Sequence, residues 1–170
     1  FRSSKLDCIT SHIDFFSRTE NLEEKVLNQD IIYIGGGNTK SMLAVWREWD
    51  LDKILHIAYE KGIVMSGVSA GAICWFDKGI TDSFLNELTI IDCLGIVSGN
   101  ACPHFDEEKE REPYVNDVIN NELINSCICI EGDCALHIKN DFEHYSIDFG
   151  NGKKCYRVYK ENNDLKKEII

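Results

Sequence analysis

The chain has 170 residues, enough for one domain with its own core, and 44% of them are hydrophobic and 28% charged. Its net charge of −11, from 18 basic and 29 acidic side chains, argues against a nucleic-acid partner, because such binders carry a basic surface. No apolar run reaches the roughly 20 residues of a membrane-spanning helix, and the first residues lack the apolar region of a signal peptide, so we expect no membrane partner.

The first part of the chain alternates between strand-like and helix-like patterns. Apolar runs predict strands over 6–17, 30–38 and 63–69. Helical spacing of apolar residues, with caps at Thr19 or Asn21 and at Gly62, predicts helices over 19–29, 39–49 and 51–62 and another from about Ala70. This alternation predicts an α/β fold with a mostly parallel sheet flanked by helices on both faces.

The later part changes character and predicts hairpins. A charged loop over 106–113 precedes a helix over 114–124, and two strands surround Gly132-Asp133. The dipeptide Asn151-Gly152 is a strong turn signal and predicts a further hairpin. We find no repeat and no second domain, so the expectation is a single domain over 1–170.

A serine among small residues marks the candidate site. The sequence Gly67-Val68-Ser69-Ala70-Gly71 follows an apolar strand and opens a helix, which is the pattern of a nucleophile elbow. Small neighbours remove collisions at such a cramped turn, and the Ala70 N–H is placed to bind a developing oxyanion. The other reading is a tightly packed turn without chemistry.

A second glycine-rich loop, Gly35 to Thr39, also ends a strand and opens a helix. Loops at the carboxyl ends of parallel strands share one crevice, so this loop is expected beside Ser69, where it can supply a second oxyanion donor. It lacks the full glycine patterns of nucleotide-binding loops, so a phosphate site is the weaker reading.

The serine needs a base, and the chain has five histidines. His104 is the favoured base because it directly follows a predicted strand and precedes the charged loop, behind the stiffening Pro103. The other four are expected to be structural or solvated: His12 in the first strand, His56 on a helix, and His137 and His144 in late strands. The chemistry of a triad leaves four acids as candidates for its third member, namely Asp82, Asp106, Glu131 and Asp133.

The eight cysteines are interpreted as free thiols in a reducing cytosol, which predicts a cytoplasmic protein. Five of them lie in apolar segments, as small core residues do: Cys74, Cys93, Cys127, Cys129 and Cys134. A metal set of Cys127, Cys129, Cys134 and His137 is the alternative. Its spacing matches no common zinc site, so we expect no metal and no cofactor.

Four motifs in order resemble the dipeptidase E (aspartyl dipeptidase) group of serine peptidases, which includes cyanophycinase. They are "IIYIGGGNTKSML", "GVSAGAICWF", "CPHFD" and "IEGDCALH", and the likeness runs from about Asp30 to Tyr159. The segment "SAGAICWFDKG" with "TDS" is most similar to the peptidase E-like bacterial branch. The resemblance implies a flavodoxin-like fold akin to class I glutamine amidotransferases. It also implies that the chain lacks an N-terminal strand and helix that family members carry.

The resemblance also implies roles for individual residues. It assigns a Ser-His-Glu triad to Ser69, His104 and Glu131, with Asp82 as a minority candidate for the acid. The family reads acid-Asp-Gly where this chain has Glu131-Gly132-Asp133, so Asp133 stays open as well. The oxyanion donors would be the N–H groups of Ala70 and of Gly36 or Gly37.

The expected activity is hydrolysis of short peptides, with N-terminal aspartate preferred, through an acyl-enzyme on Ser69. An aspartate side chain requires a cation, and Arg111 is the candidate for binding it; a solvated loop charge is the alternative. Other readings are a carboxylester hydrolase and a catalytically inactive family member. A homodimer through Trp46, Trp49 and Trp75 is a further possibility, although a core position suits these side chains better.

Overall fold

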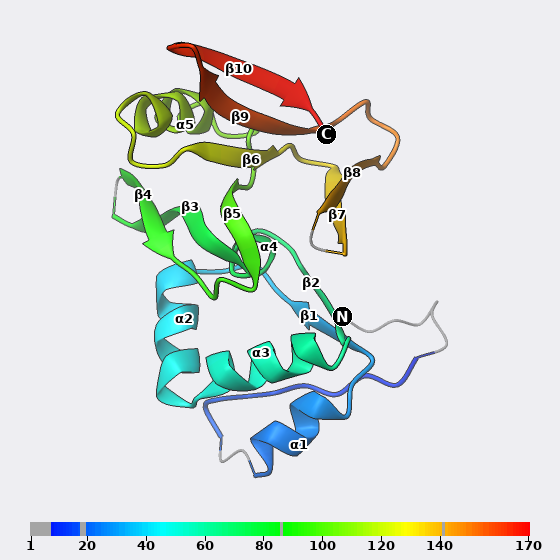
Figure 1. Ribbon diagram of the computed structural model, residues 1–170. Helices are drawn as coiled ribbons and strands as arrows, with labels where there is room; N and C mark the ends of the chain where they lie inside the picture. Colours follow the sequence, from blue (N-terminus) through cyan, green and yellow to red (C-terminus); the bar gives the residue numbers. More distant parts are fainter. Residues whose placement is uncertain (1–7, 18–19, 86, 141) are drawn as a thin grey trace.

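The computed structural model describes residues 8–17, 20–85, 87–140 and 142–170 (Figure 1). The helices are α1 (Leu22–Leu27), α2 (Thr39–Glu48), α3 (Leu51–Glu60), α4 (Ala70–Ile73) and α5 (Arg111–Asn120). The first strands are β1 (Ile31–Ile34), β2 (Val64–Gly67), β3 (Phe76–Phe84), β4 (Glu87–Asp92) and β5 (Val97–Cys102). The later strands are β6 (Ser126–Ile130), β7 (Cys134–Lys139), β8 (Glu143–Asp148), β9 (Cys155–Glu161) and β10 (Asp164–Ile169).

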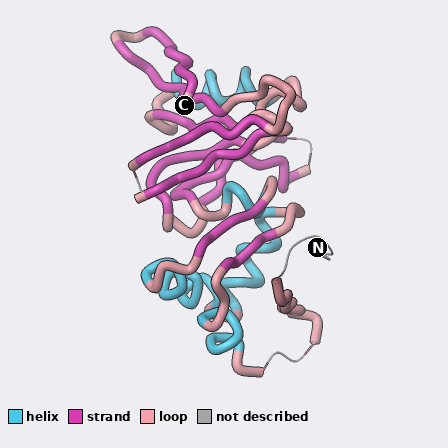
Figure 2. The backbone as a smooth tube through the Cα atoms, turned by 90° about the vertical axis from the view of Figure 1, so that its right-hand side faces the viewer, coloured by secondary structure: helices cyan, strands magenta, loops and turns pink. Residues whose placement is uncertain are grey.

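The strands form three sheets. A parallel pair joins β1 to β2, a six-stranded sheet has the order β10-β9-β6-β5-β3-β4, and an antiparallel hairpin joins β7 to β8. Helices α1, α2 and α3 gather at the end of the molecule that carries β1 and β2, whereas α5 and the C-terminal strands lie at the other end (Figures 1 and 2).

The prediction of an α/β fold is confirmed, but the prediction of a mostly parallel sheet is wrong. In the six-stranded sheet, β3 pairs with β5 and β5 with β6 in parallel, while the β3–β4, β6–β9 and β9–β10 pairs are antiparallel. Strands β4, β9 and β10 each run antiparallel to their neighbours. A helix was expected from about Ala70, but α4 is a single short turn and the chain continues as β3.

The predicted helices over 19–29, 39–49 and 51–62 are confirmed as α1, α2 and α3, with Asn21 as the N-cap of α1 and Thr19 outside the described residues. Asn38 caps α2, because its side-chain oxygen accepts the N–H of Ser41. After α3, Gly62 adopts the left-handed conformation (φ 82°) expected of a C-cap glycine. Helix α5 begins at Arg111 inside the expected charged loop, since Pro113 is tolerated in the first turn of a helix.

Two other elements predicted from the sequence are wrong. In residues 8–17 there is no strand, so His12 is not on one, and Ile9 and Phe16 are fully exposed. The Asp14 carboxylate instead accepts the N–H of Phe16 and the hydroxyl of Ser17, which stabilises a local turn.

The hairpin predicted about Asn151-Gly152 is also absent from this region. Strand β8 pairs with β7, and β9 pairs with β6 and β10. The Asp148 carboxylate accepts the N–H groups of Gly150, Asn151 and Gly152, so this segment folds around a side chain. The late hairpins are β7–β8 and β9–β10.

The core is built from three apolar clusters, one under α2 and α3, one between α5 and the six-stranded sheet, and one beside α4. Trp46 and Trp75 belong to the first cluster with 6% of their surface exposed, whereas Trp49 is 39% exposed. The core interpretation therefore holds for two of the three tryptophans, and the homodimer stays a prediction. Among the described residues, no helix is both long enough and apolar enough to span a bilayer.

Candidate active site

The parallel pairing of β1 and β2 brings the two glycine-rich loops together. Ile34 at the end of β1 is opposite Gly67 at the end of β2, so the loops that follow both strands leave the sheet at the same edge. One loop carries Gly36 and the other carries Ser69. The expectation that these loops are neighbours is met by this register.

Ser69 occupies a strained turn between β2 and α4. Its backbone has φ 57° and ψ −118°, a region that residues with side chains rarely adopt. A Cβ atom on Gly67 would overlap the carbonyl of Gly71, and one on Gly71 would overlap the carbonyl of Ile34. The glycines are therefore required by the close approach of α4 to β1 and β2.

The residues expected to supply the oxyanion donors lie close to Ser69. A Cβ on Gly36 would lie 3.4 Å from Cβ and 3.9 Å from Oγ of Ser69, so the backbone of Gly36 borders the nucleophile directly. Ala70 is the first residue of α4, where a backbone N–H has no acceptor within the helix. Gly37 (φ 152°) follows in the same loop as Gly36. The three residues expected to supply the oxyanion donors thus flank Ser69 in space or in sequence.

The structure brings His104 to Ser69. His104 follows β5, as predicted, and its Nε2 lies 2.9 Å from Ser69 Oγ, which is hydrogen-bond distance. The N–H of Phe105 donates to the carbonyl of Ile130 in β6, which fixes the backbone next to the imidazole. His104 itself has a positive φ of 53°, so the loop after β5 starts with a sharp change of direction.

The carboxylate on the other side of the imidazole belongs to Glu107, which is a correction to the expected arrangement. Glu107 Oε2 lies 2.6 Å from Nδ1 of His104. Glu131, which the resemblance places there, instead accepts the backbone N–H of Lys154 at 2.9 Å. With Nδ1–H donating to Glu107, Nε2 is free to accept the proton of the Ser69 hydroxyl. The signal that could have found Glu107 is its spacing of three residues from His104 in a turn-forming loop.

The remaining acids have other partners. Asp82 is 72% exposed and lies 3.9 Å from Arg111, and Asp133 accepts from the side chain of Asn151 at 3.0 Å. Asp106 accepts the N–H of Gly132 at 2.7 Å and pairs with Lys153. Burial acts to raise the pKa of Asp106, but these hydrogen bonds outweigh it and hold that pKa below its ordinary value.

Gly132 also makes room for Glu107. A Cβ atom at position 132 would lie 2.7 Å from the carboxylate carbon of Glu107, so a larger residue would require that side chain to shift. Together with the Asp106 bond, this contact ties the loop that carries His104 and Glu107 to the turn between β6 and β7.

Arg111 is not placed to bind a substrate, contrary to expectation. It is 1% exposed at the start of α5, where its Nε and Nη2 both reach Glu108 Oε2 at 2.7 Å. Its Nη1 donates to the carbonyl of Ile80 in β3 at 3.2 Å. Arg111 therefore joins the loop after His104 to β3 of the six-stranded sheet.

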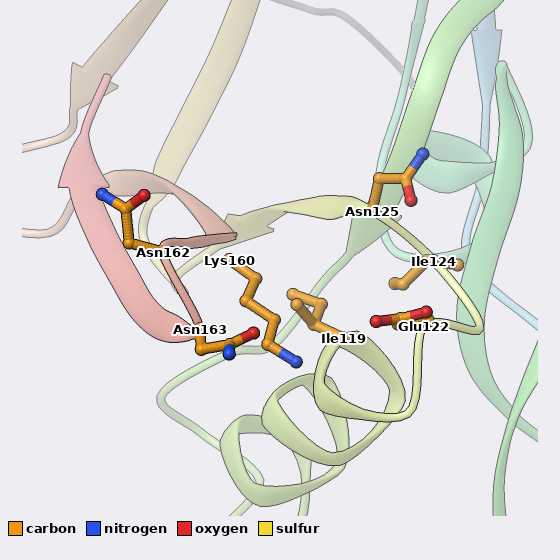
Figure 3. Close-up of a pocket in the computed structure, with 7 residues that line it drawn as sticks. All are labelled: Ile119, Glu122, Ile124, Asn125, Lys160, Asn162 and Asn163. Atoms are coloured by element: carbon orange, nitrogen blue, oxygen red, sulfur yellow. The ribbon is translucent and has the colours of Figure 1, made fainter.

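A cavity of about 1100 Å³ opens at the predicted catalytic residues and is lined by Ser69, His104, Glu107 and Glu131, among others. A second cavity, of about 840 Å³, lies between the end of α5 and the β9–β10 turn and is lined by Lys160, Glu122 and Asn163, among others (Figure 3). It contains none of the predicted catalytic residues. The candidate site is therefore the first cavity.

The cysteines form no metal site in this structure. In the described ranges, no three His, Cys, Asp or Glu side chains converge as metal ligands would. All eight cysteines lie within those ranges, and none forms a disulfide. Burial raises the pKa of Cys102 to about 12, so this thiol stays protonated at neutral pH.

Comparison with known proteins identifies the family of the chain. The sequence profile of peptidase family S51 matches residues 2–145, and the chain belongs to this family of serine peptidases. It is 41% identical over 161 residues to the uncharacterized peptidase YgaJ of Bacillus subtilis (strain 168), a match that covers 94% of this chain and 70% of YgaJ.

A crystal structure of a candidate peptidase E from Listeria monocytogenes EGD-e has a similar fold, with a TM-score of 0.50 at 16% identity. The match covers 87% of this chain but spans only 63% of the length of the Listeria protein. The match to peptidase family S51 confirms the resemblance to the dipeptidase E family. The finer likeness to class I glutamine amidotransferases stays a prediction.

Gly71→Ala should destabilise the protein by about 1–3 kcal/mol, because the new Cβ overlaps the Ile34 carbonyl and forces α4 away from β1. Gly35→Ala is the matched control, since a Cβ there meets no atom within 4 Å. Its unfolding free energy should stay within about 0.5 kcal/mol of the original. Urea unfolding measures both, and equal losses in the two variants would contradict the close-approach argument.

Arg111→Met should lower the free energy of unfolding by about 1–3 kcal/mol, because the Ile80 carbonyl and the Glu108 carboxylate lose a buried donor. Arg157→Met, at an exposed position of β9, serves as the control and should change it by less than about 0.5 kcal/mol. If Arg111→Met were as stable as the original protein but had a higher KM for acidic peptides, Arg111 would regain its substrate-binding role.

Proposed function

We propose that the chain cleaves short peptides through an acyl-enzyme on Ser69. The observation that carries this proposal is the 2.9 Å approach of His104 Nε2 to Ser69 Oγ at a strained strand-to-helix turn. Membership of peptidase family S51 supports the serine mechanism. We propose as well that the fold is akin to class I glutamine amidotransferases, as the resemblance implies.

In the first half-reaction, Ser69 Oγ attacks the carbonyl carbon of the scissile bond while His104 Nε2 accepts the hydroxyl proton. The negative charge on the carbonyl oxygen is stabilised by the N–H groups of Ala70 and of Gly36 or Gly37, each worth about 3 kcal/mol in comparable sites. His104 then returns the proton to the leaving amine, and the peptide bond breaks.

In the second half-reaction, water replaces the amine. His104 takes a proton from this water, the hydroxide attacks the ester carbonyl, and the same N–H groups hold the oxyanion. The proton passes to Ser69 Oγ as the ester bond breaks. The acid product leaves and the serine is regenerated.

Glu107 is our candidate for the residue that orients the imidazole and stabilises its charged form. The 2.6 Å distance to Nδ1 supports this role, and Glu131 retains the alternative because it lines the same cavity. The order Ser69, His104, Glu107 differs from the Ser-Asp-His order of α/β-hydrolases, which argues against an ordinary esterase.

The substrate class is a short peptide, and the preference for N-terminal aspartate loses the support of Arg111, which is buried in a network of its own. A carboxylester hydrolase would use the same nucleophile, so it remains the alternative function. A cytoplasmic location and a homodimer remain predictions.

Ser69→Ala and His104→Ala should each lower kcat/KM for peptide hydrolysis by about 10³-fold or more, because the nucleophile and its base act as one unit. Labelling with a fluorophosphonate provides a second readout, and only proteins that keep both residues should react. A folded, unmodified protein whose Ser69 never reacts would indicate the inactive reading. Turnover of an aryl ester without turnover of any peptide would indicate the esterase.

Glu107→Gln should lower kcat by about 10²- to 10⁴-fold with little change in KM, because the amide cannot stabilise the imidazolium. Glu131→Gln is the matched control and should keep most of the activity. The opposite ranking of the two variants would transfer the third triad position to Glu131. Circular dichroism should show that both variants keep the fold.

A further inference from the structure

The cavity at Ser69 is bordered by the edges of two strands. Residues 64–67 of β2 and residues 134–139 of β7 all line it, without a gap in either run. Successive side chains of a strand point to opposite faces, so a strand that presents only one face contributes every second residue. Uninterrupted runs indicate that both strands meet the cavity with their backbone edges.

The edge of β2 that faces the cavity has hydrogen-bonding groups to offer. In the described part of the chain, β2 pairs only with β1. The N–H groups of Val64 and Val68 donate to the carbonyls of Asp30 and Ile34 on the β1 side. Because the direction of these groups alternates along a strand, the N–H and C=O groups of Met65 point away from β1, as do those of Gly67.

This edge leads directly to the nucleophile. Strand β2 runs from Val64 toward Ser69, and β7 starts beside Gly132, which lies against Glu107. At about 3.3 Å per residue, the four residues of β2 extend about 13 Å from the turn at Ser69 and the six residues of β7 about 20 Å. An extended dipeptide covers only about 7 Å, so it would leave most of this length empty.

We propose that the site takes an extended peptide longer than a dipeptide, whose main chain pairs with the Met65 and Gly67 edge of β2 as an added strand. This inference rests on the proposed function, since it supplies the scissile bond to Ser69. Main-chain pairing of this kind gives affinity with little demand on side chains. It fits a cavity of about 1100 Å³ in which Arg111 offers no cation for an aspartate.

Two series of fluorogenic substrates test the proposal. One adds one to five alanine residues before the scissile bond, and the other adds them after it. In at least one series, kcat/KM should rise by about tenfold or more beyond the dipeptide length, since each added main-chain hydrogen bond contributes about 3- to 10-fold. A flat response in both series would overturn the proposal.

The best peptide is then compared with a copy that is N-methylated at one residue away from the scissile bond, scanned along its length. At one or more positions, kcat/KM should fall by about 3- to 10-fold, because the methyl group removes a donor and blocks strand pairing. Equal turnover of all N-methylated copies would overturn the proposal, and this test leaves the protein unchanged.

On the protein side, Met65→Pro removes the N–H from the free edge of β2, whereas Met65→Ala removes only the side chain and is the matched control. Proline is tolerated at a strand edge that donates no ladder bond. The ratio of long-peptide to dipeptide turnover should fall by about 3- to 10-fold in Met65→Pro relative to Met65→Ala. Equal ratios would overturn the proposal.

Fluorophosphonate labelling of Ser69 separates this inference from the proposed function. If the protein reacts with the fluorophosphonate and cleaves dipeptides and longer peptides equally well, the proposed function stands and the pairing with the β2 edge is wrong. If the protein never reacts, both the proposed function and the pairing with the β2 edge are wrong.

Discussion

The structure depends on the close approach of one short helical turn to two strand ends. The backbone of α4 passes so near β1 and β2 that Gly67 and Gly71 have no space for a Cβ atom. This contact forces Ser69 into its strained conformation and brings Gly36 beside it. The strain is sustained by the packing of Ile73 and Cys74, both fully buried directly after the turn. Main-chain packing thus positions Ser69, Gly36 and Ala70, the proposed nucleophile and oxyanion donors.

The base is positioned in a different way. The loop of His104 and Glu107 lies near the surface, and Glu107 is 52% exposed. The ion pair of His104 and Glu107 does little to fix its own geometry, because exposed ion pairs are weak and are screened by solvent and salt. Its geometry instead comes from three anchors outside the pair. They are the Phe105 N–H on Ile130, the Asp106 carboxylate on the Gly132 N–H, and Arg111, which pairs with Glu108 and donates to the carbonyl of Ile80 in β3. Each anchor attaches the loop to a different part of the six-stranded sheet or its turns.

The sequence was informative where local chemistry decides the structure. Glycine spacing around Ser69 and the strand before His104 predicted the two residues that the structure brings into contact. Partners chosen by long-range pairing were not predictable in this way. The Asn151-Gly152 pair predicted a hairpin, but the segment instead folds around the Asp148 carboxylate, and β8 pairs with β7. Glu107 was missed because its contact with His104 depends on a turn that β6 and Arg111 stabilise from outside. Arg111 was expected to bind substrate or to be a solvated loop charge, because its burial depends on the long-range contact with Ile80 in β3.

The burial of Arg111 changes what the site can recognise. A cation held by Glu108 and by a backbone carbonyl cannot also meet a substrate carboxylate, because its donors are already directed inward. The cavity beside Ser69 presents the N–H and C=O groups of strand edges. These groups bind the main chain of a peptide, which repeats the same groups whatever its side chains are. A site built in this way selects for an extended main chain and for length, and it leaves side-chain preference to the few residues nearest the scissile bond.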